Sequence, residues 1–185
     1  FYLQFSGEIK ETYENWSRYF LNNIKPIWEN NRYAIYPPSD KMRIYKNGIL
    51  ILEQQESRSV FSYDFKGAII NELRQYQGLL SCDLATCVSQ FPKNIAELYL
   101  NNIAKGEVFE ANIDYDWYGA EFSDGWREAI GQAEIIAKDD YDKLLARGVQ
   151  MDAAKLVILP QTLYKKLDKR FKGISAVRRA DMVAA

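Results

Sequence analysis

Hydrophobic residues recur along the chain with two different periods, which predict a mixture of helices and strands. Near the N-terminus, apolar residues return every three or four positions from Ile9 to Phe20, so we expect an amphipathic helix over residues 8–22. The same spacing, with Pro92 as a helix-starting residue, predicts two further helices over residues 79–90 and 92–106.

The alternating segments predict strands, and one pair of them is joined by a characteristic turn. Met42–Lys46 and Ile49–Leu52 flank Asn47-Gly48, a dipeptide typical of a two-residue hairpin because both residues tolerate a positive φ. A third strand is expected over Val60–Phe65. Two more strands are expected, at residues 32–36 and 108–118, the second with alternation at Ile113, Tyr115 and Trp117.

The last third of the chain has a different pattern, in which short apolar runs alternate with helical segments. After a short helix at 126–132, this order is strand, helix, strand, helix, which favours a parallel strand pair; the segments are 133–137, 139–147, 155–159 and 161–171. We therefore predict an α+β fold: a hairpin-containing sheet packed with helices, followed by a small βαβα subdomain. The expected organisation is an N-terminal helical segment (1–38), an α+β domain (39–120) and a small α/β subdomain with a basic tail (121–185).

Composition narrows the classes of function. Of the 185 residues, 48% are hydrophobic and 26% charged, which is typical of a globular protein, and the net charge of −1 argues against a simple polyanion-binding protein. No apolar run is long enough to span a membrane and no signal-peptide pattern opens the chain, so we predict a cytoplasmic protein without membrane association. Because the first residue is Phe rather than Met, we expect the chain to be a fragment, a processed product or an otherwise incomplete form of a longer protein.

Histidine is absent, which removes the usual general base near neutral pH and the commonest metal ligand. Hydrolases of the Ser-His or Cys-His type and His-based zinc enzymes are therefore excluded. Cys82 and Cys87 lie five positions apart, off a common helix face, so we interpret them as core thiols rather than a disulfide or a metal pair.

Carboxylates gather in two segments. In the first, two aspartates of the predicted strand would share a face and could offer oxygens to a divalent cation, which leaves a metal-dependent enzyme as one hypothesis; its members are Asp114, Asp116, Glu121 and Asp124. The second opens a predicted helix, where acidic residues complement the helix dipole; its members are Asp139, Asp140 and Asp142. Structural roles are our prediction for both segments, and we predict no metal site.

The C-terminal stretch carries a local excess of positive charge. It could meet the phosphates of a nucleic acid or an acidic partner, although a solvated helix face is the simpler interpretation. Its members are Lys165, Lys166, Lys169, Arg170, Lys172, Arg178 and Arg179.

One arginine has a more specific context. The segment Ile70–Arg74 follows the third strand, and we expect it to enter a helix, which places Arg74 on a loop at the strand-to-helix transition. An arginine in that position can present its planar donor fork to a phosphate held by another domain or chain.

These segments together resemble a known family. Met42–Ile51, Phe61–Phe65 and Ile70–Arg74 are similar to the middle domain of GHKL-type ATPases, with phage rIIA-like proteins closest and the heat-shock chaperone middle domain more distant. In the chaperones the equivalent of the last segment reads Leu-Asn-x-Ser-Arg-Glu, and its arginine reaches the γ-phosphate of ATP. Asn71 and Arg74 match its Asn and Arg, whereas Gln75 stands where the family has Glu. Including weaker similarity in the α/β part, the resemblance covers about residues 42–175.

The resemblance implies a transducer-type module with a three-layer α+β domain, in which Arg74 is the catalytic γ-phosphate sensor and Asn71 shapes its loop at the cofactor. No Asp-x-Gly-x-Gly adenine-binding loop occurs in the sequence, so ATP with magnesium would bind only once a missing nucleotide-binding domain is supplied. The partners implied are that ATPase domain or a partner chain, with a homodimer as one form. The alternative hypothesis is a non-enzymatic interaction module of a phage or defence system, working through the aromatic N-terminal helix or the basic C-terminal residues.

Overall fold

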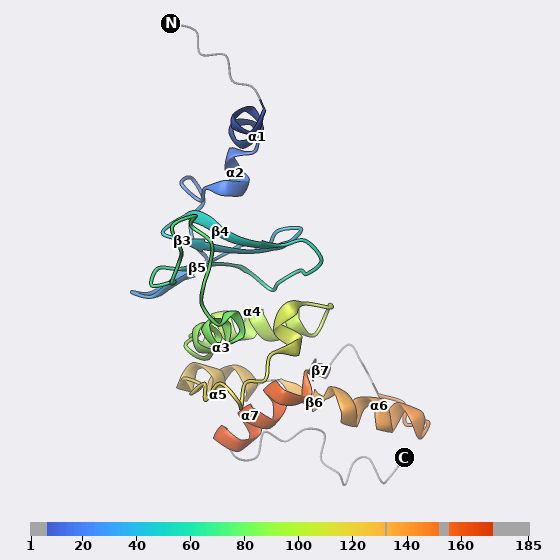
Figure 1. Ribbon diagram of the computed structural model, residues 1–185. Coiled ribbons are helices and arrows are strands. Elements are labelled where there is room, and N and C mark those ends of the chain that lie inside the picture. The colour runs from blue at the N-terminus through green and yellow to red at the C-terminus, as the bar shows by residue number, and fades with distance from the viewer. Residues whose placement is uncertain (1–6, 132, 152–155, 172–185) are drawn as a thin grey trace, which may run out of the picture. The chain divides into compact units, whose positions relative to one another are not determined.

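The computed structural model describes residues 7–131, 133–151 and 156–171, and the chain divides into two compact units, Phe1–Gly78 and Leu79–Ala185 (Figure 1). The first unit is built around a mixed β-sheet, and the second contains helices and a pair of parallel strands. The predicted α+β class is therefore confirmed. No described helix is long and apolar enough to cross a membrane.

The sheet of the first unit has five strands in the order β1-β2-β5-β3-β4. Neighbouring strands are antiparallel, except that β3 and β5 run parallel. All four residues of β5 are buried, as expected for a strand with a neighbour on each side. The strands are β1 (Trp28–Glu29), β2 (Tyr33–Tyr36), β3 (Met42–Lys46), β4 (Ile49–Gln54) and β5 (Ser62–Phe65).

The predicted hairpin is confirmed. Lys46 of β3 pairs with Ile49 of β4, so the connection is the two-residue loop Asn47-Gly48. Both loop residues have positive φ, 49° at Asn47 and 78° at Gly48, as a type I′ turn requires.

The helix expected over residues 8–22 is instead two short helices, α1 (Glu8–Glu14) and α2 (Trp16–Tyr19). The break falls at Asn15, whose side-chain amide donates to the Glu11 carbonyl and whose backbone leaves the helical region (φ −105°, ψ 27°). The chain then becomes extended at Phe20, which forms a bridge with Ile49 of β4. None of the residues of α1 is buried.

The second unit begins with the two helices that the periodicity predicts, followed by a segment that departs from its prediction. Residues 108–118 are not a strand: they form a short 3-10 helix and a turn. The Asp114 carboxylate accepts the backbone N–H groups of Asp116 and Trp117, which a strand would need for its ladder. The elements are α3 (Leu80–Ser89), α4 (Lys93–Ile103), η1 (Phe109–Asn112) and α5 (Asp124–Ile130).

The βαβα order at the end of the chain is confirmed. Its strands pair in parallel, with Ile135 opposite Val157 and Ile136 opposite Ile158. The elements are β6 (Glu134–Ala137), α6 (Lys138–Ala146), β7 (Leu156–Leu159) and α7 (Gln161–Phe171).

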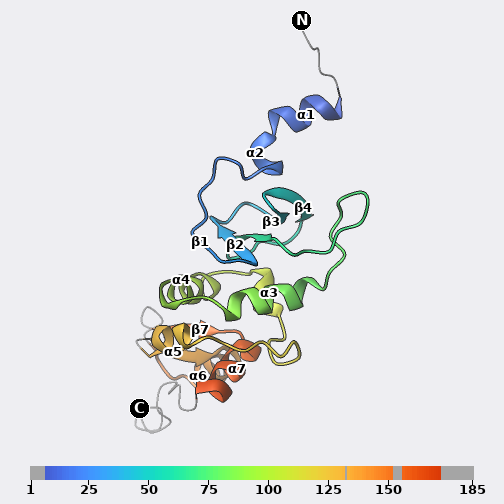
Figure 2. The same cartoon turned by 90° about the vertical axis from the view of Figure 1, so that its left-hand side faces the viewer.

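The unit boundary lies between Gly78 and Leu79, whereas the sequence patterns predicted boundaries after residues 38 and 120. The chain does not divide after residue 120 because α5 packs along α4 (Figure 2). The indole N–H of Trp126 donates to the Val88 carbonyl at 3.0 Å, and the Ser123 hydroxyl donates to the Phe91 carbonyl at 2.8 Å. These contacts join α5 to the helical layer of α3 and α4.

Candidate functional site

Residues 69–77 form a short hairpin that carries Arg74 at its tip. The Gln77 N–H donates to the Ile69 carbonyl at 2.8 Å, and the Asn71 N–H donates to the Gln75 carbonyl at 3.0 Å. Ile70 and Tyr76 form an antiparallel bridge between these two bonds. The hairpin therefore closes on a three-residue loop, Glu72–Arg74, a common loop length.

The side chain of Asn71 fastens this loop. Its Oδ1 accepts the Gln75 N–H at 2.9 Å, and its Nδ2 donates to the Gln75 Oε1 at 3.0 Å. Both polar atoms of the amide thus face the loop itself. Asn71 is accordingly placed to shape the loop that presents Arg74, and Gln75 supplies the matching amide.

Arg74 occupies an unusual backbone conformation. Its φ is 57°, in the left-handed region, where a three-residue hairpin loop commonly ends and where glycine is the favoured residue. A residue with a Cβ in that region costs about 1–2 kcal/mol. The Arg74 side chain is exposed and makes no ion pair with any residue in the described part of the chain. The expected helix at this point is wrong, since the next helix begins at Leu80.

The Arg74 hairpin is attached to the Asn47-Gly48 hairpin at two places. The Tyr76 N–H donates to the Ile51 carbonyl of β4 at 3.3 Å. The Lys46 ammonium donates to the Ala68 carbonyl at 2.5 Å, just before the Arg74 hairpin starts. The β3–β4 hairpin therefore braces the segment that carries Arg74.

A buried carboxylate holds the turn of that brace. Asp64 of β5 is 3% exposed, and its two oxygens accept the N–H groups of Asn47 at 2.8 Å and Gly48 at 2.7 Å. Burial raises the pKa of Asp64, and the two backbone N–H groups lower it by less, so its pKa lies above the usual value. The two backbone N–H groups of the turn are the hydrogen-bond donors to this buried carboxylate. We therefore interpret Asp64 as a structural residue that holds the turn.

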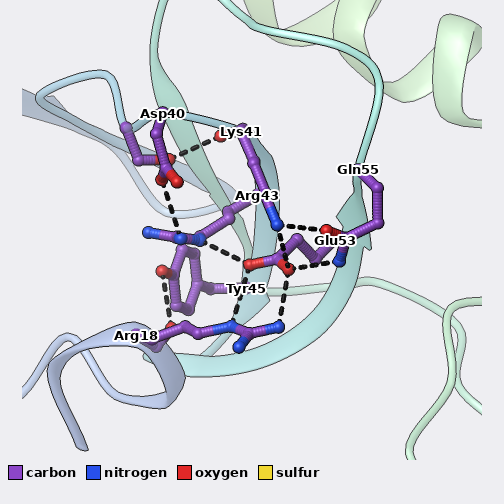
Figure 3. A network of polar contacts seen from close by, with 8 residues as sticks. Arg18, Asp40, Lys41, Arg43, Tyr45, Glu53 and Gln55 are labelled. Atoms are coloured by element: carbon purple, nitrogen blue, oxygen red, sulfur yellow. Dashed lines mark hydrogen bonds and ion pairs between the residues drawn. The ribbon is translucent and has the colours of Figure 1, made fainter. Parts of the chain in front are cut away.

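A second polar cluster surrounds Glu53 of β4, whose side chain is 6% exposed (Figure 3). Arg18 of α2 donates two hydrogen bonds to the Glu53 carboxylate, from Nε to Oε2 at 3.0 Å and from Nη2 to Oε1 at 2.7 Å. Arg43 of β3 donates its Nε to the same Oε2 at 2.7 Å, and Gln55 donates to Oε1 at 2.7 Å. The Tyr45 hydroxyl also donates to the Arg18 carbonyl at 3.0 Å.

This Glu53 cluster fastens the N-terminal helices to the sheet. Burial alone raises the pKa of Glu53, but the hydrogen bonds from Arg43 and Arg18 outweigh it, so its pKa lies below the usual value. Because the carboxylate's oxygens are already occupied by these donors, the arrangement suits a structural clasp better than a proton-transferring group.

The remaining predicted candidates are spread over the second unit. No group of three or more His, Cys, Asp or Glu side chains within the described residues is arranged to hold a metal ion. Asp114 caps its turn, and Asp139 and Asp140 lie in the first turn of α6. Both cysteines are free thiols; Cys87 is buried, which raises its pKa, and Cys82 is half-buried.

Part of the basic C-terminal group lies on α7. Lys166 and Lys169 approach the Asp116 carboxylate at 3.4 and 3.6 Å, and the Thr162 hydroxyl donates to the Ile113 carbonyl at 2.7 Å. These contacts attach α7 to the turn at residues 113–119. Lys172, Arg178 and Arg179 lie outside the described residues.

Arg74 and Asn71 are the site residues predicted from the sequence, and their roles stay a prediction, whereas the structural roles of Asp64 and Glu53 were not predicted. A charged residue among the aromatic residues of Val60–Phe65 was the available signal for Asp64. No local signal joins Glu53 to Arg18, because the two are 35 positions apart. Comparisons of the chain with protein-family models, with curated proteins and with solved structures each found no match.

Proposed function

We propose that this chain is an arginine-presenting module that completes the phosphate site of a nucleotide-binding domain, in the manner of the GHKL and rIIA-like transducer domains it resembles. The observation that carries the proposal is the state of Arg74. It lies at the tip of a fastened hairpin in a strained left-handed conformation, exposed and without an ion-pair partner among the described residues. Strain of this kind tends to be kept at functional sites.

The chemistry of the side chain fits this role. A guanidinium offers a planar fork of donors that matches phosphate oxygens, and it stays protonated at all working pH values. An arginine already bound to a carboxylate would have its donors occupied, whereas Arg74 has them available to an incoming phosphate. In other nucleotide hydrolases an inserted arginine is worth about 10³–10⁵ in rate. Asn71 acts through the loop rather than on the nucleotide, and ATP with magnesium would come with the partner domain.

Reconstitution tests the proposal. A rIIA-like nucleotide-binding domain, purified separately, is assayed for ATP hydrolysis while this chain is added in increasing amounts. We expect turnover to rise and saturate, and we expect the chain alone to show no saturable heat with Mg·ATP in isothermal titration. Micromolar ATP binding by the chain alone, or no stimulation at any concentration, would count against the proposal.

A second candidate function is protein interaction without catalysis, as in a phage or defence-system component. It is favoured by α1, which buries none of its residues and exposes Ile9 and Tyr13 at 62% and 68%. Exposed apolar side chains of this size, spaced along one helix face, are typical of helix-in-groove recognition. This function involves no catalysis and requires nothing of Arg74, so it is favoured if neither the wild type nor the Arg74→Ala variant changes the rate of hydrolysis by the nucleotide-binding domain.

A further inference from the structure

The exposed face of α1 and α2 contains a hollow of about 350 Å³. Ile9, Tyr13 and Trp16 supply its apolar wall, at 62%, 68% and 46% exposure. Glu8 and Thr12 complete the lining. Ile9 and Tyr13, four positions apart, share one face of α1. Trp16 follows the break at Asn15 and adds the first residue of α2 to the same hollow.

The chemistry of the hollow favours a cationic side chain with an aliphatic stem. Aromatic rings attract an ammonium or guanidinium group through their faces, and the carboxylate of Glu8 adds a countercharge. The apolar wall would cover the methylene stem of a lysine or arginine. The surrounding helix has the same sign of charge as Glu8: α1 carries three carboxylates against one lysine.

The Glu53 cluster holds this face at a defined place on the first unit. Arg18 of α2 makes two bonds to Glu53, and the Leu21 N–H donates to the Gly48 carbonyl at 2.9 Å. The hollow therefore belongs to a segment that is attached to the sheet.

A complementary surface lies on α7 in the second unit. The helix carries four cations against one aspartate; Lys165 and Lys169, four positions apart, share an exposed face. Trp117 is 81% exposed and lies next to Asp116, the residue that pairs with Lys166 and Lys169. The second unit thus exposes lysines together with a large aromatic side chain.

We propose that the α1 hollow of one copy receives the basic face of α7 from a second copy of this chain, with Lys165 entering the hollow and Lys169, which approaches Asp116 of its own chain, adding positive charge beside it. Opposite charge on the two helices and exposed aromatic side chains on both surfaces carry the inference. The nearly neutral net charge of the whole chain conceals this separation of charge between α1 and α7. The contact is independent of Arg74 and its role.

The size of the contact sets its strength. A helix of seven residues buries much less than the roughly 800 Å² per partner of a standard interface, so the association is weak and depends on charge. Screening shortens the range of such attraction from roughly 30 Å at about 0.01 M salt to roughly 3 Å at about 1 M salt. Association should therefore be concentration-dependent at low salt and lost at high salt.

Sedimentation velocity of the full chain, from micromolar to millimolar concentration and after nuclease treatment, tests the proposal. We expect the average mass to rise above the 21.5 kDa of one chain at low salt only. Two variants reverse the charge of one surface each: Glu8→Lys with Glu11→Lys on α1, and Lys165→Glu with Lys169→Glu on α7. Each should weaken self-association by about tenfold or more.

Mixing the two variants gives the decisive result. The lysine-bearing α1 of one can bind the glutamate-bearing α7 of the other, so association should return in the mixture. A matched control, Lys138→Glu with Lys143→Glu on α6, makes the same change of net charge elsewhere and should associate like the wild type. A monomeric wild type, association that needs nucleic acid, or a mixture that stays monomeric would overturn the proposal.

Discussion

The carboxylate of Asp64 accepts the backbone N–H of Gly48 at 2.7 Å, which joins the central strand β5 to the turn of the β3–β4 hairpin. The neighbouring N–H of Asn47 points at the same carboxylate. The β3–β4 hairpin in turn contacts the chain at Ala68, just before the Arg74 hairpin, and at Tyr76 within it. Asp64 therefore supports the Arg74 loop indirectly, through the β3–β4 hairpin.

Asp64→Ala should destabilise the first unit by about 2–3 kcal/mol, because two N–H groups lose a charged acceptor in a buried place. Asp64→Asn should cost less, since its amide oxygen can still accept from one of the two. Urea denaturation followed by circular dichroism measures both. Equal stability of Asp64→Ala and the wild type would show that the turn does not depend on this carboxylate.

Gly48→Val should destabilise the protein by about 1–3 kcal/mol through backbone strain. Its φ of 78° disfavours any residue with a Cβ, although the space itself is open, with the nearest atoms of Leu21 and Asn22 at 3.9 Å. Gly67→Val is the matched control, since Gly67 has neither a positive φ nor neighbours within 4 Å. The difference between the two denaturation midpoints isolates the effect of φ.

The Glu53 cluster predicts how stability changes with pH. The folded-state pKa of Glu53 is lowered, so its contribution is complete above the unfolded value of about 4.5 and is lost as the pH falls through the folded value. The pH dependence that Asp64 contributes has the opposite direction. Its folded-state pKa is raised, so its contribution to stability is complete below the unfolded value of about 3.8 and is lost as the pH rises through the folded value.

Glu53→Gln should therefore lower stability at pH 7 by about 1–3 kcal/mol and remove part of the loss of stability below pH about 4.5. Denaturation curves of both proteins across the acidic range provide the comparison. A variant whose stability falls with acid as steeply as that of the wild type would contradict the assigned role of Glu53.

Arg74→Gly should stabilise the protein by about 0.5–1 kcal/mol, because glycine adopts the left-handed conformation without strain. Arg74→Ala keeps a Cβ in the same conformation and should change stability by no more than about 0.5 kcal/mol. Thermal unfolding of the two variants separates backbone strain from side-chain contacts. A large loss of stability in Arg74→Ala would identify the side chain as a structural residue.

Much of the fold could be predicted, because turns and element periodicities depend on residues that are close together in the sequence. Asn47-Gly48 favours a two-residue turn through the backbone preferences of its own two residues, and the spacing of apolar residues predicted α7 with the bounds observed. The parallel pairing of β6 and β7 followed from the order of the elements. The strand predicted over residues 108–118 was wrong for an equally local reason, because the side chain of Asp114 accepts backbone N–H groups that a strand would need.

The candidate site was only partly predictable. The exposed loop position of Arg74 was predicted, and its role stays a prediction. The hairpin around it was expected to be a helix entry, because the pairing of Asn71 with Gln75 uses amides that leave no periodic pattern. The link from Arg18 to Glu53 joins residues far apart in sequence, and such pairs become visible only in three dimensions.

The most direct test of the central claim is the turnover number of the reconstituted ATPase with Arg74→Ala. At saturating amounts of this chain, the variant should lower kcat by about 10³-fold while its thermal stability stays the same. Arg74→Lys should recover only part of the rate, because an ammonium lacks the planar fork. Arg58→Ala, which removes another exposed arginine from the first unit, should hydrolyse ATP like the wild type. Equal kcat for Arg74→Ala and Arg58→Ala would contradict the claim that Arg74 acts on the phosphate.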